Sequence, residues 1–395
     1  MPRFPSPAPS AVGLSDRVFG QLVRKSGSKS ESPKDTRLYP LHVGDTYLEP
    51  LPLARAEAQV TSSRAKLHTY SPVQGEPELL RAIADKVARR SGVQLDIENL
   101  QVMSGATAGL GVVCTALLDP GDEVILPAPF WPLIRGIIRS RGAKAVEVPL
   151  FTQLADPSFD AVAAIERAIT PRTVAIYVNT PHNPTGAMLP ERVLAGIAEL
   201  AKRHDLWLLS DEVYEDVYFT PDAPPSVFAR SDFQGRTIST HSVSKAYGLA
   251  GARVGFTHGP REIMEVIRGV QTFYSYCAPR PMQFGAAQAL AEGDGWLDDM
   301  RRLYGSAGRA SAEALGIPAP AGGTFLFFDL ARYIGKNETL MTVLERCLDA
   351  GVMLTPGTAC GQDFTTWARL CFTVLPENEL REALDKLRGA LGIKA

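Results

Sequence analysis

Residues 100–126, LQVMSGATAGLGVVCTALLDPGDEVIL, alternate between short apolar stretches and a longer helical one. Leu100 to Met103 and Glu123 to Leu126 have the length and composition of buried strands. Ala106 to Leu118 between them has the length and apolar spacing of a helix, and a Pro-Gly-Asp turn precedes the second strand. A strand, a helix and a strand in this order predict a right-handed crossover between parallel strands.

The same alternation continues on both sides of this unit. We expect further helices at Glu78 to Arg90, Pro132 to Ser140, Ala161 to Ile169 and Glu191 to Arg203. We expect further strands at Ala145 to Val148, Val174 to Val178, Leu206 to Leu209 and Thr237 to His241. The pattern predicts an α/β fold with a mostly parallel central sheet covered by helices on both faces. Ligands of such sheets bind beyond the carboxyl ends of the strands.

The pattern changes after about Gly285, where the helices become longer. We expect helices at Trp296 to Leu315, Met341 to Ala350 and Glu377 to Leu391, and strands at Thr324 to Asp329, Val352 to Leu354 and Ala368 to Phe372. This pattern of longer helices and apolar strands predicts a second, smaller α/β domain. We place a large domain at residues 48–285, a small domain at 286–395, and an N-terminal arm with part of the small domain at 1–47. The arm includes an amphipathic stretch around Val18 to Val23 and a polar run at residues 25–35.

Composition excludes several classes of protein. The 395 residues carry 41 basic and 43 acidic side chains, a net charge of −2, which argues against a broad nucleic-acid or membrane surface. The longest uncharged run, residues 100–118, is interrupted by polar residues and glycines, so no membrane span is expected. The first ten residues lack the apolar core of a secretion signal. Five scattered cysteines without metal-type spacing predict a cytoplasmic protein with no metal site.

Lys245 lies in the stretch SVSKAYGLAGAR, residues 242–253. An isolated lysine in a loop is usually a surface residue. Here two serine hydroxyls, flexible glycines and Arg253 surround it, a combination that favours an anion beside the lysine. A lysine desolvated in such a place has a lowered pKa and can form a Schiff base with an aldehyde.

Five other motifs each allow two interpretations. Asn183-Pro-Thr-Gly186 forms either a simple turn or polar contacts past a strand. Asp211 is either a helix cap or a buried carboxylate that keeps a bound pyridine ring protonated. Gly105-Ala-Thr107 is either an ordinary strand-to-helix turn of the kind that many α/β proteins share, or a helix start whose free N–H groups can hold a phosphate. Trp131 packs in the core or stacks on a flat cofactor, and Arg369 pairs with an internal acid or a substrate carboxylate.

Taken together, the order and spacing of these motifs resemble the class I/II aminotransferases, pyridoxal-phosphate enzymes of fold type I that include aspartate aminotransferase. The resemblance extends from about Leu41 to Leu391. Its matching elements are Tyr70-Ser-Pro-Val-Gln-Gly75, Gly105-Ala-Thr107, Asp119-Pro-Gly-Asp-Glu-Val124, Asn183-Pro-Thr-Gly186, Ser210-Asp-Glu-Val-Tyr214, Ser242-Val-Ser-Lys245, Gly251-Ala-Arg253 and Arg369.

The resemblance implies a role for each matching residue. Lys245 would form the Schiff base with pyridoxal phosphate and later move a proton between the substrate Cα and the cofactor C4′. Asp211 would pair with the pyridinium nitrogen, Asn183 and Tyr214 would hydrogen-bond the phenolic oxygen, and Trp131 would stack on the ring. The cofactor phosphate would be bound by Gly105, Ala106, Thr107, Ser242, Arg253 and, from the partner subunit of a homodimer, Tyr70. Arg369 and the backbone near Gly44 would bind the substrate α-carboxylate.

The implied activity is transfer of an amino group between an α-amino acid and a 2-oxo acid by a ping-pong route. Thr107 stands where some aspartate-using members have a lysine, and residues 271–280, expected as a loop, include Phe273, Tyr274 and Tyr276 with Arg280 as their one cation. We therefore expect neutral or aromatic amino acids to be preferred. Two alternatives remain at this point: another pyridoxal-phosphate reaction, such as a β-lyase, γ-elimination, oxidase or hydroxylase reaction, and a ligand-sensing domain of a transcription regulator. The short Pro/Ser-rich start does not supply the helix-turn-helix module that such regulators carry.

Overall fold

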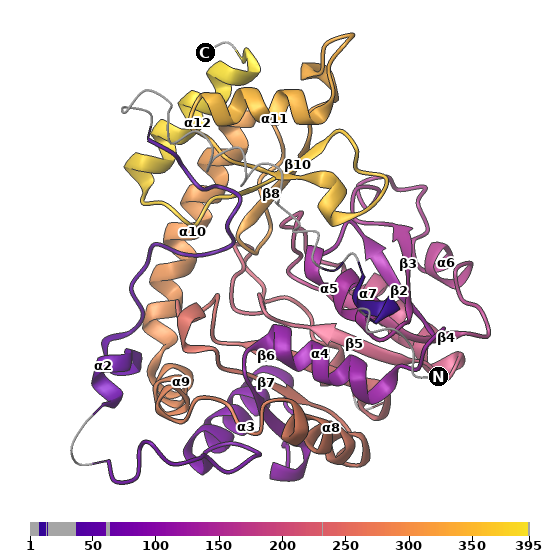
Figure 1. Ribbon diagram of the computed structural model, residues 1–395, viewed down its shortest axis with the longest axis vertical. Helices are drawn as coiled ribbons and strands as arrows, with labels where there is room; N and C mark the ends of the chain where they lie inside the picture. The colour runs from indigo at the N-terminus through magenta and orange to yellow at the C-terminus, as the bar shows by residue number, and fades with distance from the viewer. Residues whose placement is uncertain (1–7, 13, 15–36, 61–63, 231, 394–395) are drawn as a thin grey trace, which may run out of the picture.

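The computed structural model describes residues 8–12, 14, 37–60, 64–230 and 232–393, and contains two sheets (Figure 1). The seven strands of the larger sheet lie in the order β1-β7-β6-β5-β4-β2-β3 among these residues. Their bounds are β1 Leu100–Met103, β2 Glu123–Ala128, β3 Lys144–Pro149, β4 Thr173–Asn179, β5 Trp207–Asp211, β6 Thr237–Ser242 and β7 Gly255–His258. The arm segments predicted around Val18 to Val23 and at residues 25–35 lie outside the described residues.

Helices cover both faces of this sheet, as the alternating pattern predicts. On one face, side chains of α4 (Ala106–Leu117), α5 (Pro132–Ser140) and α8 (Arg261–Tyr274) share one apolar core with the sheet. On the other face, α6 (Ala161–Glu166) and α7 (Glu191–Arg203) build a second core. Among the described residues, the remaining α-helices before residue 293 are α2 (Ala56–Gln59), α3 (Pro77–Ser91) and α9 (Arg280–Glu292). The apolar runs within β2 and β4 are buried on both faces, which explains why they lack the alternation of a half-exposed strand.

The predicted mostly parallel sheet is confirmed, with one exception. Strand β7 runs antiparallel to both of its neighbours, β1 and β6, while the other pairings in the sheet are parallel. Three elements, β7 (Gly255–His258), α8 (Arg261–Tyr274) and α9 (Arg280–Glu292), were not expected from the sequence pattern. It was also wrong to treat residues 271–280 as one loop, because residues 271–274 form the last turn of α8 and Arg280 begins α9.

The second sheet consists of β8 (Phe325–Asp329), β9 (Thr355–Pro356) and β10 (Trp367–Cys371). These antiparallel strands lie in the order β8-β10-β9. It lies against α10 (Asp294–Leu315), α11 (Leu340–Asp349) and α12 (Glu377–Leu391) (Figure 1). The strand expected at Val352 to Leu354 is wrong: Val352 makes an isolated bridge to Tyr39, and the paired strand begins three residues later. The helix expected to reach Ile169 ends at Glu166.

This arrangement brings polar residues together at one edge of the large sheet. Asn179, Asp211 and Ser242 end the adjacent strands β4, β5 and β6. Strand β10 of the small sheet faces this edge, and its Arg369 reaches Asn183 in the loop after β4. The described residues include no helix that combines the length and the apolar character needed to cross a membrane.

Candidate active site

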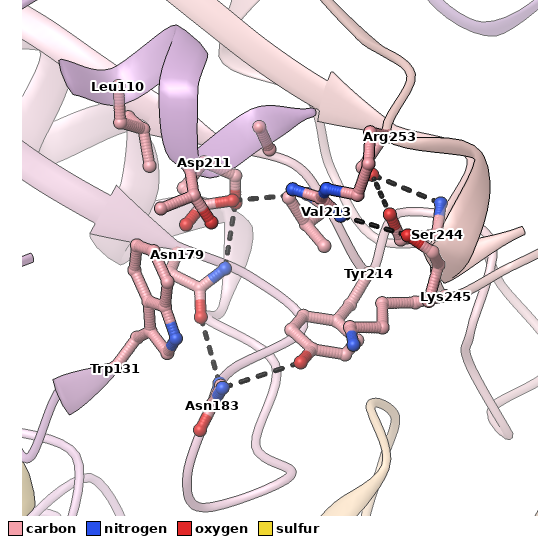
Figure 2. Close-up of a pocket in the computed structure, with 14 residues that line it drawn as sticks. Leu110, Trp131, Asn179, Asn183, Asp211, Val213, Tyr214, Ser244, Lys245 and Arg253 are labelled. Carbon is pink, nitrogen blue, oxygen red and sulfur yellow. Dashed lines mark hydrogen bonds between the residues drawn. The ribbon is translucent and has the colours of Figure 1, made fainter. Parts of the chain in front are cut away.

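A cavity lies at the carboxyl ends of β4, β5 and β6, where α4 begins (Figure 2). Its empty volume is about 590 Å³, a figure that includes open solvent at the mouth. The residues lining it are Ala106, Thr107, Leu110, Trp131, Asn179, Asn183, Asp211, Val213, Tyr214, Ser242, Ser244, Lys245, Ala250 and Arg253.

One end of the cavity is suited to an anion. Helix α4 begins after Gly105 and has no acidic residue in its first turn, so its first N–H groups and its dipole favour negative charge. The Arg253 guanidinium packs directly on Gly105, where an added Cβ would lie 2.4 Å from a guanidinium nitrogen. The Ser242 and Ser244 hydroxyls are 2.8 Å apart beside it. Two hydroxyls, one guanidinium and a helix N-terminus together match a phosphate.

Asp211 lies at the centre of the cavity and is buried. The Tyr177 hydroxyl donates to Asp211 Oδ2 at 2.6 Å, and the Val213 N–H donates to Oδ1 at 3.2 Å. The Asn179 amide donates to the Asp211 carbonyl oxygen at 2.8 Å. Burial raises the pKa of Asp211 to about 6 despite these hydrogen bonds. A buried carboxylate held in this way is stabilised by a bound cation, such as a protonated ring nitrogen.

Arg369, Asn183 and Tyr214 form a continuous chain of contacts. Arg369 donates to Asn183 Oδ1 at 3.0 Å. The Asn183 amide in turn donates to the Tyr214 hydroxyl at 3.3 Å (Figure 2). The Arg369 guanidinium also packs over the Phe325 ring at 4.2 Å. Its buried Nε has no hydrogen-bond partner among the described residues, which leaves a donor for a carboxylate.

Lys245 projects into the same cavity from the loop after β6 (Figure 2). Its Nζ donates to the Gly44 carbonyl oxygen at 2.5 Å. Burial lowers the pKa of Lys245, which increases the fraction of neutral amine available as a nucleophile or base.

The structure brings most of the predicted site residues together. Nine line the cavity: Ala106, Thr107, Trp131, Asn183, Asp211, Tyr214, Ser242, Lys245 and Arg253. Gly105, Gly44 and Arg369 contact members of that group. Tyr70 lies apart from them in this chain, 80% exposed, with its ring in edge contact with Tyr276.

Sequence reasoning missed several lining residues and one partner. Asn179 is the last residue of β4, four positions before Asn183, and its Oδ1 accepts the Asn183 N–H at 2.8 Å. A polar residue ending an apolar strand could have signalled it. Ser244, inside the quoted lysine motif, was noted only as a source of hydroxyls. Tyr177 carried no signal, because a tyrosine within a buried strand is typical core packing.

The aromatic residues expected to face the substrate side chain do not line this cavity. Phe273 and Tyr274 are 91% and 62% exposed. Arg280 makes its contacts outside this cavity. Its Nε lies 2.8 Å from Glu76 Oε1, and its Nη1 donates to the Thr69 hydroxyl and to the Lys66 carbonyl oxygen. Arg280 therefore makes no contribution to the charge of this cavity in the single chain.

An anion cradle, a buried carboxylate and a lysine of lowered pKa are three separate features that match the phosphate, ring nitrogen and aldehyde of pyridoxal phosphate. With the fold, they define a pyridoxal-phosphate enzyme of fold type I. The family of aminotransferases of class I and II matches residues 37–387, and the chain belongs to it. It is thus a pyridoxal-phosphate-dependent aminotransferase.

Known relatives agree with this family. The chain is 33% identical to the aspartate/prephenate aminotransferase of Thermus thermophilus over 338 residues, 82% of this chain and 83% of the relative. It is 34% identical to the arginine–pyruvate transaminase AruH of Pseudomonas aeruginosa over 358 residues, 88% of each chain. A solved structure of a Thermus thermophilus aspartate aminotransferase mutant superposes with a TM-score of 0.88 at 27% identity, covering 98% of this chain and all of that one.

Proposed function

We propose that this aminotransferase moves an amino group between a neutral or aromatic α-amino acid and a 2-oxo acid, using Lys245 as its reactive amine. The observation that carries the proposal is the position of Lys245, whose Nζ contacts Gly44 in a cavity shared with Asp211 and Arg253. The Arg369–Asn183–Tyr214 chain connects this cavity with the small sheet.

Each residue has a physical task toward the cofactor. Bound pyridoxal phosphate supplies an electron sink for the charge left when a substrate Cα–H bond breaks. Asp211 holds a proton on the ring nitrogen by its negative charge in a low-dielectric site. Tyr214 and Asn183 would hydrogen-bond the phenolic oxygen of the bound cofactor, and Trp131, which lines the cavity, would stack on its ring. Gly105, Ala106, Thr107, Ser242 and Arg253 bind the phosphate.

Substrate orientation follows from Arg369. A guanidinium that binds the α-carboxylate bidentately fixes rotation about Cα, which aligns the bond to be broken with the ring π system. Lys245 Nζ donates to the Gly44 carbonyl oxygen at 2.5 Å, which places the reactive amine beside the backbone segment that the resemblance assigns to the α-carboxylate. Lys245, as a neutral amine, would move a proton between the substrate Cα and the cofactor C4′.

The side-chain preference rests on charge. Thr107 lines the cavity where a lysine would meet a distal carboxylate, and Arg280 is paired with Glu76. A distal carboxylate entering without a fixed cation loses hydration, which costs several kcal/mol. An apolar side chain gains about 25 cal/mol per Å² buried. These terms favour phenylalanine, leucine or methionine over aspartate.

We further propose a cytoplasmic homodimer. Phe273, Tyr274 and Tyr276 are exposed, and Tyr276 is in edge contact with Tyr70. A second chain would bury these side chains and bring Tyr70 to its phosphate site. We propose residues 48–285 as the cofactor-binding domain, and residues 286–395 with part of 1–47 as the small domain.

A half-reaction tests the proposal directly. Purified protein loaded with pyridoxal phosphate is mixed with single amino acids, and the cofactor absorbance and the released 2-oxo acid are measured. We expect phenylalanine, leucine or methionine to convert the cofactor to its amine form, and added 2-oxoglutarate or pyruvate to convert it back. Release of ammonia or consumption of oxygen in place of reversible amine transfer would contradict the proposal.

A further inference from the structure

A buried charge cluster lies behind the segment that carries Asp211 and Tyr214. Asp211 and Tyr214 face the cavity, whereas Glu212, Glu215 and Asp216 are buried outside its lining. A turn connects the cavity residues Asp211 and Tyr214 with these outer carboxylates: the Glu215 N–H donates to the Glu212 carbonyl oxygen at 3.0 Å. The position of these outer carboxylates therefore restrains the position of the two cavity residues.

Two cations from α3 bind the outer carboxylates. Arg90 Nε lies 2.7 Å from Glu215 Oε2 and 3.9 Å from Glu212 Oε2. Lys86 Nζ lies 2.5 Å from Asp216 Oδ2 and 3.6 Å from Glu215 Oε1. Among the ion pairs of the described residues, these three carboxylates meet two permanent cations, which leaves one negative charge without an ionic partner. A third cation, Arg301, donates its Nε to the Asp216 backbone carbonyl at 2.9 Å but forms its ion pair with Asp298. An unbalanced buried charge is strongly unfavourable.

His241, on β6, is the remaining titratable partner of Glu215. Its Nδ1 lies 2.9 Å from Glu215 Oε1, and its Nε2 lies 3.0 Å from Nε2 of His258 on β7. The His241 ring is stacked on Phe256 with centroids 4.5 Å apart, which fixes both contacts. Two ring nitrogens at this distance share one proton, so one histidine donates and the other accepts.

The charge balance decides which histidine carries the extra proton. An imidazolium at His241 donates to both Glu215 and His258 and neutralises the cluster. Burial alone would lower the pKa of His241, but the Glu215 carboxylate outweighs it and the pKa of His241 is raised. Burial, aided by the nearby His241, holds the pKa of His258 well below its usual value, so His258 is the neutral acceptor.

Glu212, Glu215 and His241 also have the proximity of a metal-binding group. Arg90 and Lys86 already contact these carboxylates, and their positive charges oppose a metal ion. The arrangement is an ion network between α3, the segment after β5, β6 and β7.

We propose that His241 is a positively charged positioning residue, which holds Asp211 and Tyr214 toward the cofactor by anchoring Glu215 against His258. This inference rests on the roles proposed above for Asp211 and Tyr214. His241 does not line the cavity; it acts through the 211–216 segment. The Glu212 N–H also donates to the Thr240 carbonyl at 2.9 Å, so β6 restrains the same segment at two adjacent points.

The test compares His241→Gln with His204→Gln, since His204 is a surface histidine also paired with a glutamate, at 3.6 Å from Glu166. The affinity of each apoprotein for pyridoxal phosphate is measured by absorbance titration between pH 6 and 9. We expect His241→Gln to weaken binding about tenfold at pH 7.5, or about 1.4 kcal/mol, and His204→Gln to match wild type.

A double variant that restores the net charge of the cluster distinguishes the proposed role of the His241 charge from a purely structural role of this residue. The double variant Glu215→Gln/His241→Gln removes one carboxylate along with the imidazolium, which restores the balance, so its affinity should return to within about threefold of wild type. The wild-type affinity should also fall as pH rises through the raised pKa of His241, whereas that step should be missing in His241→Gln. A purely structural role would lower the unfolding temperature of the apoprotein without removing a step from the pH profile.

The outcomes are distinct. Equal affinity and pH profile in His241→Gln and wild type would overturn the inference. If His241→Gln does not fold, the double variant decides: folding and binding support the charge balance, and failure of either overturns it. A wild-type protein that neither binds pyridoxal phosphate nor transfers amines would instead refute the proposed function.

Discussion

Two regions of the molecule differ in how far a single chain pairs and buries their side chains. One is the edge of the large sheet that bears Asp211 and Asn183; the other, the aromatic surface, consists of the exposed residues Tyr70, Phe273, Tyr274 and Tyr276. At the sheet edge, Asp211 and Asn183 each have hydrogen-bond partners from neighbouring elements, at 2.6–3.3 Å. At the surface, Tyr70 is 80% and Phe273 is 91% exposed. The first region is organised by contacts within the chain. The second exposes large apolar side chains in a group, which is typical of a surface that another molecule covers.

This difference indicates that the two regions have separate roles. The sheet edge has the charges and donors for the cofactor and the α-carboxylate. The aromatic surface would complete the phosphate site and the side-chain pocket of a second chain. Variants at the sheet edge should therefore affect the chemistry of a chain's own site, whereas variants at the aromatic surface should affect its partner's site.

Lys245→Ala should have the largest effect. Loss of the reactive amine should lower the rate of amine transfer by about 10⁴-fold or more. Borohydride should attach pyridoxal phosphate covalently to Lys245 in wild type, as peptide mass spectrometry would show, and not in the variant. Exposed Lys336→Ala is the matched control and should behave as wild type. A Lys245→Ala protein with both normal labelling and turnover would show that the sheet edge does not hold the reactive amine.

Arg369→Lys should have the next largest effect, about 10²–10³-fold in kcat/KM for amino acids, because a point charge replaces a bidentate contact. The Arg369 side chain is buried and bound to Asn183 at 3.0 Å. Kinetics with phenylalanine and with phenethylamine, which has no carboxylate, separate the effects. We expect the loss for phenylalanine only. Equal loss for both would mean that Arg369 supports the fold of the site and does not bind the carboxylate.

Mixing two inactive variants tests whether the aromatic surface serves a partner. Lys245→Ala and a disabling Tyr70 variant, exchanged in equal amounts, should regain about a quarter of wild-type activity, since half of the dimers are mixed and each has one intact site. Activity after exchange and mass by light scattering are the measurements. No recovery, or a fully active monomer, would contradict the assignment of Tyr70 to the neighbouring site.

The pH dependence of cofactor affinity tests whether the buried Asp211 carboxylate pairs with the ring nitrogen of the cofactor. The ionised carboxylate binds a pyridinium and the neutral acid does not, so affinity should fall as pH decreases through about 6, the raised pKa of Asp211. The expected decrease is about tenfold per pH unit at most. Asp211→Asn should bind weakly and without this acid step. A wild-type affinity that is constant down to pH 4 would disprove the pairing.

Substrate preference should show the smallest effect. We expect kcat/KM for phenylalanine to exceed that for aspartate by about tenfold or more, which is roughly 1.4 kcal/mol. Arg280→Ala should leave this ratio unchanged, because Arg280 is bound by Glu76. Thr107→Lys should raise activity with aspartate. An aspartate preference that disappears in Arg280→Ala would show that Arg280 leaves Glu76 to enter a substrate pocket.

Local patterns in the sequence were sufficient for the α/β alternation and for helices such as α5, α7 and α12, whose bounds match the expected ranges. Their amphipathic spacing is a property of consecutive residues. Loops between strands and helices also bear short motifs, and the topology of a parallel sheet places such loops at one edge. For this reason Lys245, Asp211 and Asn183 could be expected together although they are far apart in the chain.

Only the tertiary structure decided which partners meet across the chain. Tyr177 donates to Asp211, Glu76 binds Arg280, and His241 contacts His258, yet each of these residues has an ordinary interpretation in its own segment. The antiparallel direction of β7 and the late start of β9 depend likewise on pairing with distant strands. Hydrogen bonds and ion pairs depend on the relative positions of elements packed against one another, and hydrophobic periodicity records which face of an element is buried without recording which partner it faces.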